Sequence, residues 1–255
     1  MTAVAEEVGA RCLRVEHCMG TVFTIDIRDP GCWDNAVTQA VNWLHHVDAV
    51  FSTYNAASDI SQLRRGRLAL ASADPDVRRV LDLCEQVEAE TGGCFTMFRG
   101  PALDPTGLVK GWAIEQASRL LRAHGSDNHA VNGGGDMQLA GEPEPGRPWT
   151  VGISDPNNPA RLITSATSAS RDFAVATSGI AERGQHIVDP RTGDPAVDLA
   201  SVTVTGRSLT RVDAYATAAF VMGRDGLAWV ENQPGFEAFF VFPDGATAAT
   251  SGFTG

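Results

Sequence analysis

The sequence predicts an α+β protein in which mixed or antiparallel sheets pack against helices. Segments with alternating apolar side chains, such as residues 21–27 and 199–205, are interspersed with segments of helical periodicity. Their order is irregular, which differs from the regular strand–helix alternation of α/β proteins. The chain has 255 residues, 43% of them hydrophobic, and this is enough for one large domain or two small lobes with a core.

The first half of the chain is predicted to contain one strand and three helices. Proline at the first helical position and glycine after the last one are the usual boundary signals. Residues 52–66 and 94–106 lie between helices and are rich in polar residues or turn signals, which predicts loops. The strand is expected at residues 21–27, and the helices from Asp34 to residue 51, from Asp74-Pro75 to Gly92-Gly93, and at residues 110–123.

The second half is predicted to contain more strands than helices. Strands are expected at residues 129–131, 137–140, 149–153, 171–176, 199–205 and 237–242, and helices at residues 211–223 and near Trp229. We expect a flexible segment at residues 1–14, a single domain at residues 15–244, and a small-residue tail at residues 245–255 that is frayed or partly paired.

Charge and composition exclude several classes of protein. The net charge is −11 and the sequence has no evident Lys/Arg stripe, which argues against binding to nucleic acid or to an anionic membrane. No apolar run reaches transmembrane length, and residues 1–10 lack the apolar core of a signal peptide, so we expect a cytoplasmic protein. The five cysteines are odd in number and form no C-x-x-C pair, which is typical of free, reduced thiols.

The alanine-rich helix at residues 211–223 carries the clearest candidate metal ligands. Asp213 and Thr217 are four residues apart and therefore lie one above the other on one face of the helix. A carboxylate and a hydroxyl are hard oxygen donors, which suit Mg²⁺ or Ca²⁺. A second interpretation is purely structural, because Thr210-x-x-Asp213 also fits a capping box.

Two further segments combine glycine with charged residues. Residues 103–111 run from a loop into a helix, and free backbone N–H groups together with Asp104 and Lys110 could bind a phosphate and a polar ring. The spacing is not that of a Walker loop. Residues 132–136 are either a hairpin turn or a place where the backbone approaches a ligand, with Asp136 directed into the site.

Two single residues are candidates for catalysis and for ring stacking. His186 precedes a polar turn and could accept a proton near neutral pH, although a lone histidine is more often structural. A zinc site is not expected, because no paired His/Cys spacing surrounds any histidine. Tyr54 lies in a polar loop, where its ring either stacks on a planar ligand or covers the edge of the core.

Taken in order, these segments resemble the ApbE family of FAD:protein FMN transferases. Each motif is weak alone, but eight motifs in one order are hard to obtain by chance. The matching segments are Met19-Gly20-Thr21, Phe51-Ser52-Thr53-Tyr54, Thr91-Gly92-Gly93-Cys94-Phe95, residues 104–111, 132–136, 176–179 and 186–193, and Ser201-Val202-Thr203-Val204 with residues 213–217.

The resemblance implies an ApbE-type, T-fold-like flavin transferase fold and a set of ligand contacts. The residues that would contact FAD are Met19, Tyr54, Cys94, Phe95, Thr96, Asp104, Lys110 and, through its backbone, Val188. We add Asp136 and Ser178 as expected cofactor-binding residues. Mg²⁺ would be held by the Gly107 carbonyl, the Asp213 carboxylate, the Ala216 carbonyl and the Thr217 hydroxyl.

The chain departs from the family pattern in one segment. Cys94 and Thr96 stand where the family usually has Ala and Asp, and the stretch between Phe95 and Asp104 is unusually short. The loss of the acid at residue 96 removes a partner for a flavin or sugar donor. The expected metal ligands and His186 are all present.

The resemblance implies magnesium-assisted transfer of FMN from FAD to a Thr or Ser hydroxyl of an acceptor flavoprotein, with release of AMP. His186 is the expected general base. Two alternatives stay open: hydrolysis of FAD to FMN and AMP by water, and a non-catalytic protein that binds or delivers FAD. The expected partners are therefore FAD and an acceptor protein, and neither nucleic acid nor a membrane.

Overall fold

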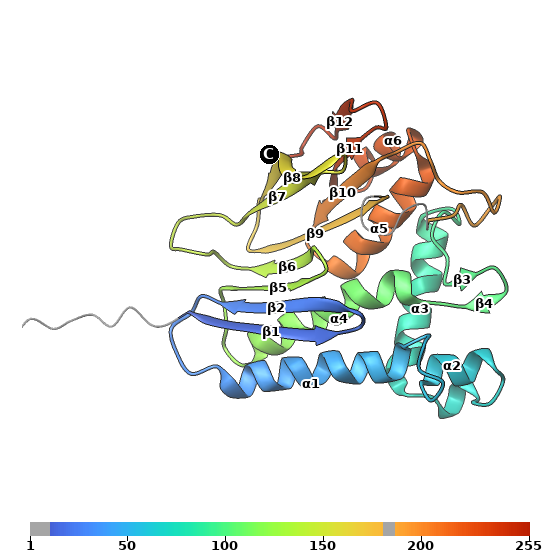
Figure 1. Cartoon of the computed structure of the whole chain (residues 1–255). Helices are drawn as coiled ribbons and strands as arrows, with labels where there is room; N and C mark the ends of the chain where they lie inside the picture. Colours follow the sequence, from blue (N-terminus) through green and yellow to red (C-terminus); the bar gives the residue numbers. More distant parts are fainter. Residues whose placement is uncertain (1–10, 181–186) are drawn as a thin grey trace, which may run out of the picture.

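The computed structural model describes residues 11–180 and 187–255. An eight-stranded sheet crosses the molecule, and helices cover one of its faces (Figure 1). All neighbouring strands of this sheet pair antiparallel. In spatial order the strands are β1 (Cys12–Cys18), β2 (Thr21–Ile27), β5 (His129–Gly133), β6 (Asp136–Ala140), β9 (Asp172–Gly179), β10 (Ser201–Gly206), β11 (Glu237–Val241) and β12 (Thr247–Ala249).

Four helices pack around the helical face of the sheet. Helix α4 contacts α1, α5 and β5, and α5 contacts β9 and β10. Phe23, Ile25 and Ile27 alternate along β2 and are fully buried on this face. The helices are α1 (Asp34–Phe51), α3 (Pro75–Glu90), α4 (Thr106–Ala123) and α5 (Leu209–Met222), with shorter helices α2 (Asp59–Arg64) and α6 (Asp225–Glu231) and a 3₁₀ turn at Leu70–Ser72.

A hairpin of β7 (Thr150–Asp155) and β8 (Asn158–Thr167) packs against the opposite face of the sheet. Trp149, Ile153 and Ala166 from this region form a second, smaller core with Phe173 and Val175 of β9. A two-strand ribbon, β3 (Phe98–Arg99) and β4 (Ala102–Leu103), leads into α4. None of the helices in the described ranges combines the length and hydropathy needed to cross a bilayer.

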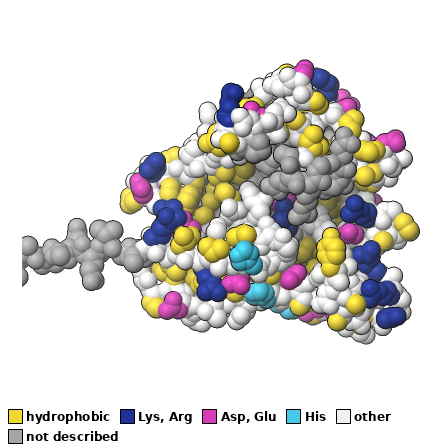
Figure 2. Space-filling view, viewed as in Figure 1, with side chains coloured by type: hydrophobic (Ala, Val, Ile, Leu, Met, Phe, Trp, Pro, Cys, Tyr) yellow, Lys and Arg dark blue, Asp and Glu magenta, His cyan; other side chains and the backbone are white. Residues whose placement is uncertain are grey.

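The α+β class and the major helices are confirmed, but several element predictions were wrong. Strand β1 begins at Cys12, inside the range expected to be flexible, and β8 was missed. Their exposed apolar residues blur the alternation, since Leu13, Val15 and Leu162 are at least half exposed. Hydrophobic side chains are visible along the open face of β1 and β2 in Figure 2.

The other differences lie in the two expected loops, and one of them is the β3–β4 ribbon within residues 94–106. Helix α2 interrupts the loop expected at residues 52–66, and the Ser58 hydroxyl caps it by accepting a hydrogen bond from the Ser61 N–H at 3.1 Å. Helix α4 begins at Thr106, four residues earlier than expected. Pro105 and Gly107 favour a turn locally, but packing against α1 and α5 overrides this preference. In the tail, β12 pairs with β11, which is the partly paired alternative.

Candidate active site

Asp104, one of the expected site residues, forms hydrogen bonds with the N-terminus of α4. Asp104 Oδ1 accepts a hydrogen bond from the Thr106 hydroxyl at 2.6 Å and a longer one from the Thr106 N–H at 3.3 Å. Gly107 lies in the first turn of this helix. The ring of Phe95 lies 3.2 Å from where a Cβ on Gly107 would be, so the segment expected to contact flavin packs directly on this turn.

Helices α4 and α5 approach closely at Gly111. A Cβ at this position would lie 2.7 Å from the Leu209 carbonyl oxygen and 2.8 Å from Asp213 Cβ, so only glycine allows the contact. The Gly111 N–H donates a hydrogen bond to Asp213 Oδ2 at 3.0 Å. Asp213 is 6% exposed, and its carboxylate is thus fixed against the side of α4.

An ion-paired lysine joins three elements of the fold at the same place. Lys110 Nζ pairs closely with Asp136 of β6 and lies 3.8 Å from Asp213 Oδ1. Asp136 is 2% exposed, and its Oδ1 also accepts a hydrogen bond from the Thr177 N–H of β9 at 3.1 Å. The two buried carboxylates of Asp136 and Asp213 and the ammonium of Lys110 are called the charged cluster below.

Burial is the main influence on the Asp213 carboxylate in this cluster. Burial raises the pKa of Asp213 to about 7; the positive charge of Lys110 and the Gly111 N–H oppose this shift, while the negative charge of Asp136 adds to it. For Asp213 the cost of burying the charged carboxylate therefore exceeds the stabilisation that Lys110 and the Gly111 N–H supply. A divalent cation would supply further positive charge, and the hard oxygen donors nearby fit Mg²⁺.

Thr217 lies one turn beyond Asp213 on α5. Its Oγ1 is 3.4 Å from Ser178 Oγ of β9, so the expected ligand Thr217 and the expected cofactor-binding residue Ser178 are neighbours. Ala216 is fully buried in the same turn. The assignment of Gly107, Asp213, Ala216 and Thr217 as metal ligands stays a prediction.

The capping-box interpretation of Thr210-x-x-Asp213 was wrong. Helix α5 has Ser208 as its N-cap residue, without a capping hydrogen bond from that side chain. The Thr210 N–H donates instead to Glu115 of α4, and Asp213 accepts from Gly111. Long-range partners thus take over the role that a local capping box would fill.

The segment at residues 94–96 is packed into the protein. Cys94 and Phe95 are each 2% exposed, and burial raises the pKa of the Cys94 thiol, as expected for an unreactive free cysteine. The Thr96 hydroxyl donates a hydrogen bond to Glu88 Oε2 of α3 at 2.9 Å. The residue that replaces the family Asp is therefore tied to an acidic side chain.

Met19 and Tyr54 lie in two separate loops. Met19 has a φ of 49° and Gly20 a φ of 69°, the left-handed conformation of a two-residue hairpin turn between β1 and β2. A non-glycine residue with a positive φ is uncommon, and here the tight hairpin turn requires it. The Tyr54 side chain is 98% exposed, so its ring is available for stacking and does not cover the core.

His186, the expected base, lies outside the described residues. The polar turn that follows it is described and holds Val188, which is 41% exposed and forms an isolated bridge with Pro195. In this turn Arg191 pairs with Asp189 at 2.7 Å, and its Cγ approaches within 4.0 Å of a Cβ built on Gly93. The turn therefore reaches residue 93, directly before the segment at residues 94–96.

Sequence reasoning missed two residues that hold this region together. Glu115 binds the N-terminus of α5, and Glu90 at the end of α3 accepts hydrogen bonds from Arg211 and from the Tyr215 hydroxyl, the latter at 2.9 Å. The only local signal for Glu115 is an acid one turn after a glycine in a helix, which is too common to be informative.

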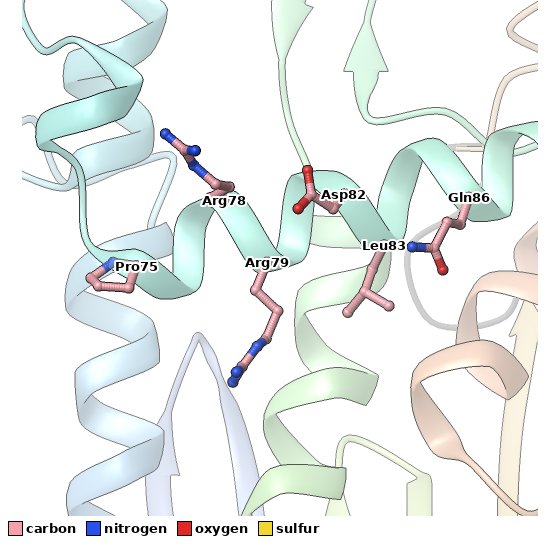
Figure 3. A pocket seen from close by; sticks show the side chains of 6 residues that line it. All are labelled: Pro75, Arg78, Arg79, Asp82, Leu83 and Gln86. Atoms are coloured by element: carbon pink, nitrogen blue, oxygen red, sulfur yellow. The ribbon is translucent and has the colours of Figure 1, made fainter.

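A hollow on the described surface lies away from the charged cluster. It has a volume of about 360 Å³ and follows the outer side of α3, and Figure 3 shows its lining residues Pro75, Arg78, Arg79, Asp82, Leu83 and Gln86. None of these residues belongs to the charged cluster. Buried, convergent polar groups are a better mark of a functional site than an exposed helix side, so we place the site at Asp213.

The fold and the cluster together define a class of protein: an antiparallel sheet backed by helices, with a buried acid–lysine site where α4 and α5 meet β6 and β9. Comparison with known proteins identifies the family. The ApbE family model matches residues 19–104 and 98–240, and the chain belongs to this family.

Several curated relatives carry the name FAD:protein FMN transferase. The protein of Treponema pallidum is 34% identical over 171 residues, which cover 60% of this chain and 47% of the relative. The protein of Vibrio cholerae is 33% identical over 139 residues, which cover 51% of this chain and 41% of the relative. The matched region is thus about half the length of these relatives.

Solved structures confirm the predicted ApbE-type fold. The flavin transferase ApbE from Vibrio cholerae superposes with a TM-score of 0.80 at 22% identity, over 95% of this chain and 97% of that one. The ApbE protein from Thermotoga maritima gives a TM-score of 0.83 at 22% identity, with the same coverage of both chains.

Proposed function

We propose that this protein is a magnesium-dependent FAD:protein FMN transferase. It would move FMN from FAD to a Thr or Ser hydroxyl of an acceptor flavoprotein and release AMP. Membership of the ApbE family and the names of the curated relatives support the activity. The observation that carries the proposal is the buried cluster of Asp213, Lys110 and Asp136 beside the N-terminus of α4.

The residues of α4 and α5 would hold the metal and the diphosphate. Mg²⁺ would bind to the Gly107 and Ala216 carbonyls, the Asp213 carboxylate and the Thr217 hydroxyl. When bound, it would neutralise the charge of the diphosphate and polarise its phosphorus–oxygen bonds. Lys110 and the positive end of the α4 dipole would contribute further positive potential in a chain whose net charge is −11.

The transfer exchanges one phosphorus–oxygen bond for another. The acceptor hydroxyl oxygen attacks the phosphorus of the FMN half of FAD, and the bond from that phosphorus to the bridging oxygen breaks. The bridging oxygen leaves with AMP. We assign His186 as the general base that takes the hydroxyl proton, and Tyr54, Met19 and the segment at residues 94–96 as flavin contacts.

Asp136 would orient Lys110. Because Asp136 is fixed by the Thr177 N–H as well as by the ion pair, it holds the lysine ammonium close to Asp213. The ammonium can then approach an anionic ligand without a search over rotamers. Because the charged side chain is already in place, less free energy is spent on reorienting it when the ligand binds.

The experiment that tests this function separates it from the two alternatives. The protein is incubated with FAD, Mg²⁺ and a candidate acceptor domain, and flavin fluorescence of the protein bands and free AMP are measured together. Labelled acceptor with equimolar AMP supports transfer. AMP without labelled protein would indicate hydrolysis, and bound FAD without AMP would indicate a binding protein.

A further inference from the structure

Glu115 of α4 is a buried acid that makes no contact with the charged cluster. Its side chain is directed at the first turn of α5, and the residue is 5% exposed. One oxygen, Oε2, accepts three hydrogen bonds: from the Ser208 hydroxyl at 2.6 Å, the Thr210 hydroxyl at 2.7 Å and the Thr210 N–H at 2.9 Å. The other oxygen pairs with Arg119 on the surface.

These bonds replace the cap that α5 lacks. The first N–H groups of a helix have no partner within the helix, and Ser208 does not cap them with its side chain. Gln138 Oε1 accepts from the Leu209 N–H at 3.0 Å, and Glu115 accepts from the Thr210 N–H. A carboxylate at this end of a helix is also favoured by the helix dipole.

Glu115 and Gly111 together attach α5 to α4 at two points. Gly111 and Glu115 are one turn apart on α4, and their partners Asp213 and Thr210 are about one turn apart on α5. Packing against α4, β9 and β10 places α5 in the fold. The two hydrogen-bonded contacts, one turn apart on each helix, further restrain the rotation of α5 and thus the direction of the Asp213 carboxylate.

We infer that Glu115 is a positioning residue for the metal-binding side of α5. It acts through α5 and touches neither the metal ligands nor the substrate. The inference rests on the proposed function in one respect, the binding of a divalent cation at Asp213. Partners that hydrogen-bond directly to metal ligands commonly contribute about 10- to 100-fold to metal affinity, and Glu115, which acts through the helix, is expected at the low end of this range.

The test is a titration of the full-length chain with Mn²⁺, in which electron paramagnetic resonance measures the bound metal. This readout does not depend on turnover. Glu115→Gln keeps the size of the side chain but removes the charge that accepts three hydrogen bonds, and we expect the Kd for Mn²⁺ to rise about tenfold. The transferase rate of this variant should recover at high Mg²⁺. Arg122→Gln is the matched control, since it removes an ion pair of α4 to Asp172 of β9 and should leave the Kd unchanged.

Two milder variants keep the test decisive if Glu115→Gln folds poorly. Ser208→Ala and Thr210→Val each remove one hydroxyl donor to Glu115 and should each raise the Kd by about two- to threefold. A Glu115→Gln protein with a lower melting temperature but an unchanged Kd would overturn the inference, because the role would then be structural only. Wild-type protein that binds no Mn²⁺ would overturn both the inference and the metal assignment of the proposed function.

Discussion

The Gly111 N–H donates a hydrogen bond to Asp213 Oδ2 at 3.0 Å, although the two residues are 102 positions apart in the sequence. This bond joins the helix that begins at the expected phosphate site to the helix that carries the expected metal ligands. It is possible because residue 111 has no side chain. The close contact of α4 and α5 therefore determines where the Asp213 carboxylate lies.

Gly111→Ala should separate the two helices. The new Cβ would meet a backbone carbonyl at 2.7 Å, which cannot move aside without a shift of α5. We expect a loss of about 1–3 kcal/mol in the free energy of unfolding, together with weaker Mg²⁺ dependence of FAD binding. Urea unfolding and flavin fluorescence titrations measure the two effects. Unchanged stability would show that the helices are less closely packed than described.

Lys110→Met should leave Asp136 and Asp213 as two buried acids without their shared cation. Breaking a buried ion pair by removing one partner typically costs about 3–5 kcal/mol, and the partial exposure of Lys110 places this case at the low end or below. FAD affinity should also fall, by about tenfold or more. Chemical denaturation and flavin fluorescence provide the measurements.

The double variant Lys110→Met/Asp136→Asn serves as the control for that loss. It removes the uncompensated charge of Asp136, so part of the stability should return while FAD affinity stays low. A double variant as unstable as the single one would mean that Lys110 stabilises the fold by packing and not by its charge.

His129 gives a stability that depends on pH. It is fully buried, with its ring nitrogens 2.8 Å from Ser118 Oγ and 2.9 Å from Ser126 Oγ. Burial and the charge of Arg122 lower its pKa from 6.5 to about 4. Between these pH values the unfolded chain binds the proton and the folded chain does not. The free energy of unfolding should therefore fall by up to about 3 kcal/mol as the pH falls through this window.

The measurement is urea unfolding at a series of pH values from about 7.5 down to about 4. Other groups titrate in the same range, so the difference between the wild type and His129→Gln isolates the contribution of the histidine. That difference should shrink as the pH falls. A difference that is constant with pH would show that His129 titrates normally.

Thr96→Asp restores the family residue but should destabilise this chain. The Thr96 hydroxyl donates to Glu88 at 2.9 Å, and a carboxylate in its place would lose that bond and face a like charge. We expect a loss of about 1–3 kcal/mol on unfolding. Adding Glu88→Gln should recover most of it, because the glutamine can donate to the new acid. Thermal unfolding of Thr96→Asp and of the double variant Thr96→Asp/Glu88→Gln measures the difference. If the two variants were equally stable, this explanation of the departure from the family pattern would be contradicted.

The sequence predicted those parts of the site that depend on local spacing. Asp213 and Thr217 are four residues apart on a helix, and Lys110 follows a loop that leads into a helix; both features are local and are seen in the structure. The flanking strands of residues 132–136 were also predicted, because their apolar periodicity is clear.

The parts that could not be predicted depend on contacts between distant residues. Thr210 and Asp213 look like a capping box until α4 supplies Glu115 and Gly111 as partners. Strand β1 carries Leu13 and Val15 on an open face, so its pattern does not separate buried from exposed positions. The roles of the metal ligands and of His186 remain predictions from the family resemblance.

The most direct test of the metal site is a Mg²⁺ titration of the wild-type protein and of Asp213→Asn in the presence of FAD. The melting temperature and the release of AMP are measured at each Mg²⁺ concentration. The new asparagine side chain is neutral, so the metal-free variant should melt at the wild-type temperature or above it. We expect Mg²⁺ to raise the melting temperature and to drive AMP release only in the wild type. Equal Mg²⁺-dependent stabilisation and turnover in Asp213→Asn would contradict the assignment of this carboxylate as the metal ligand.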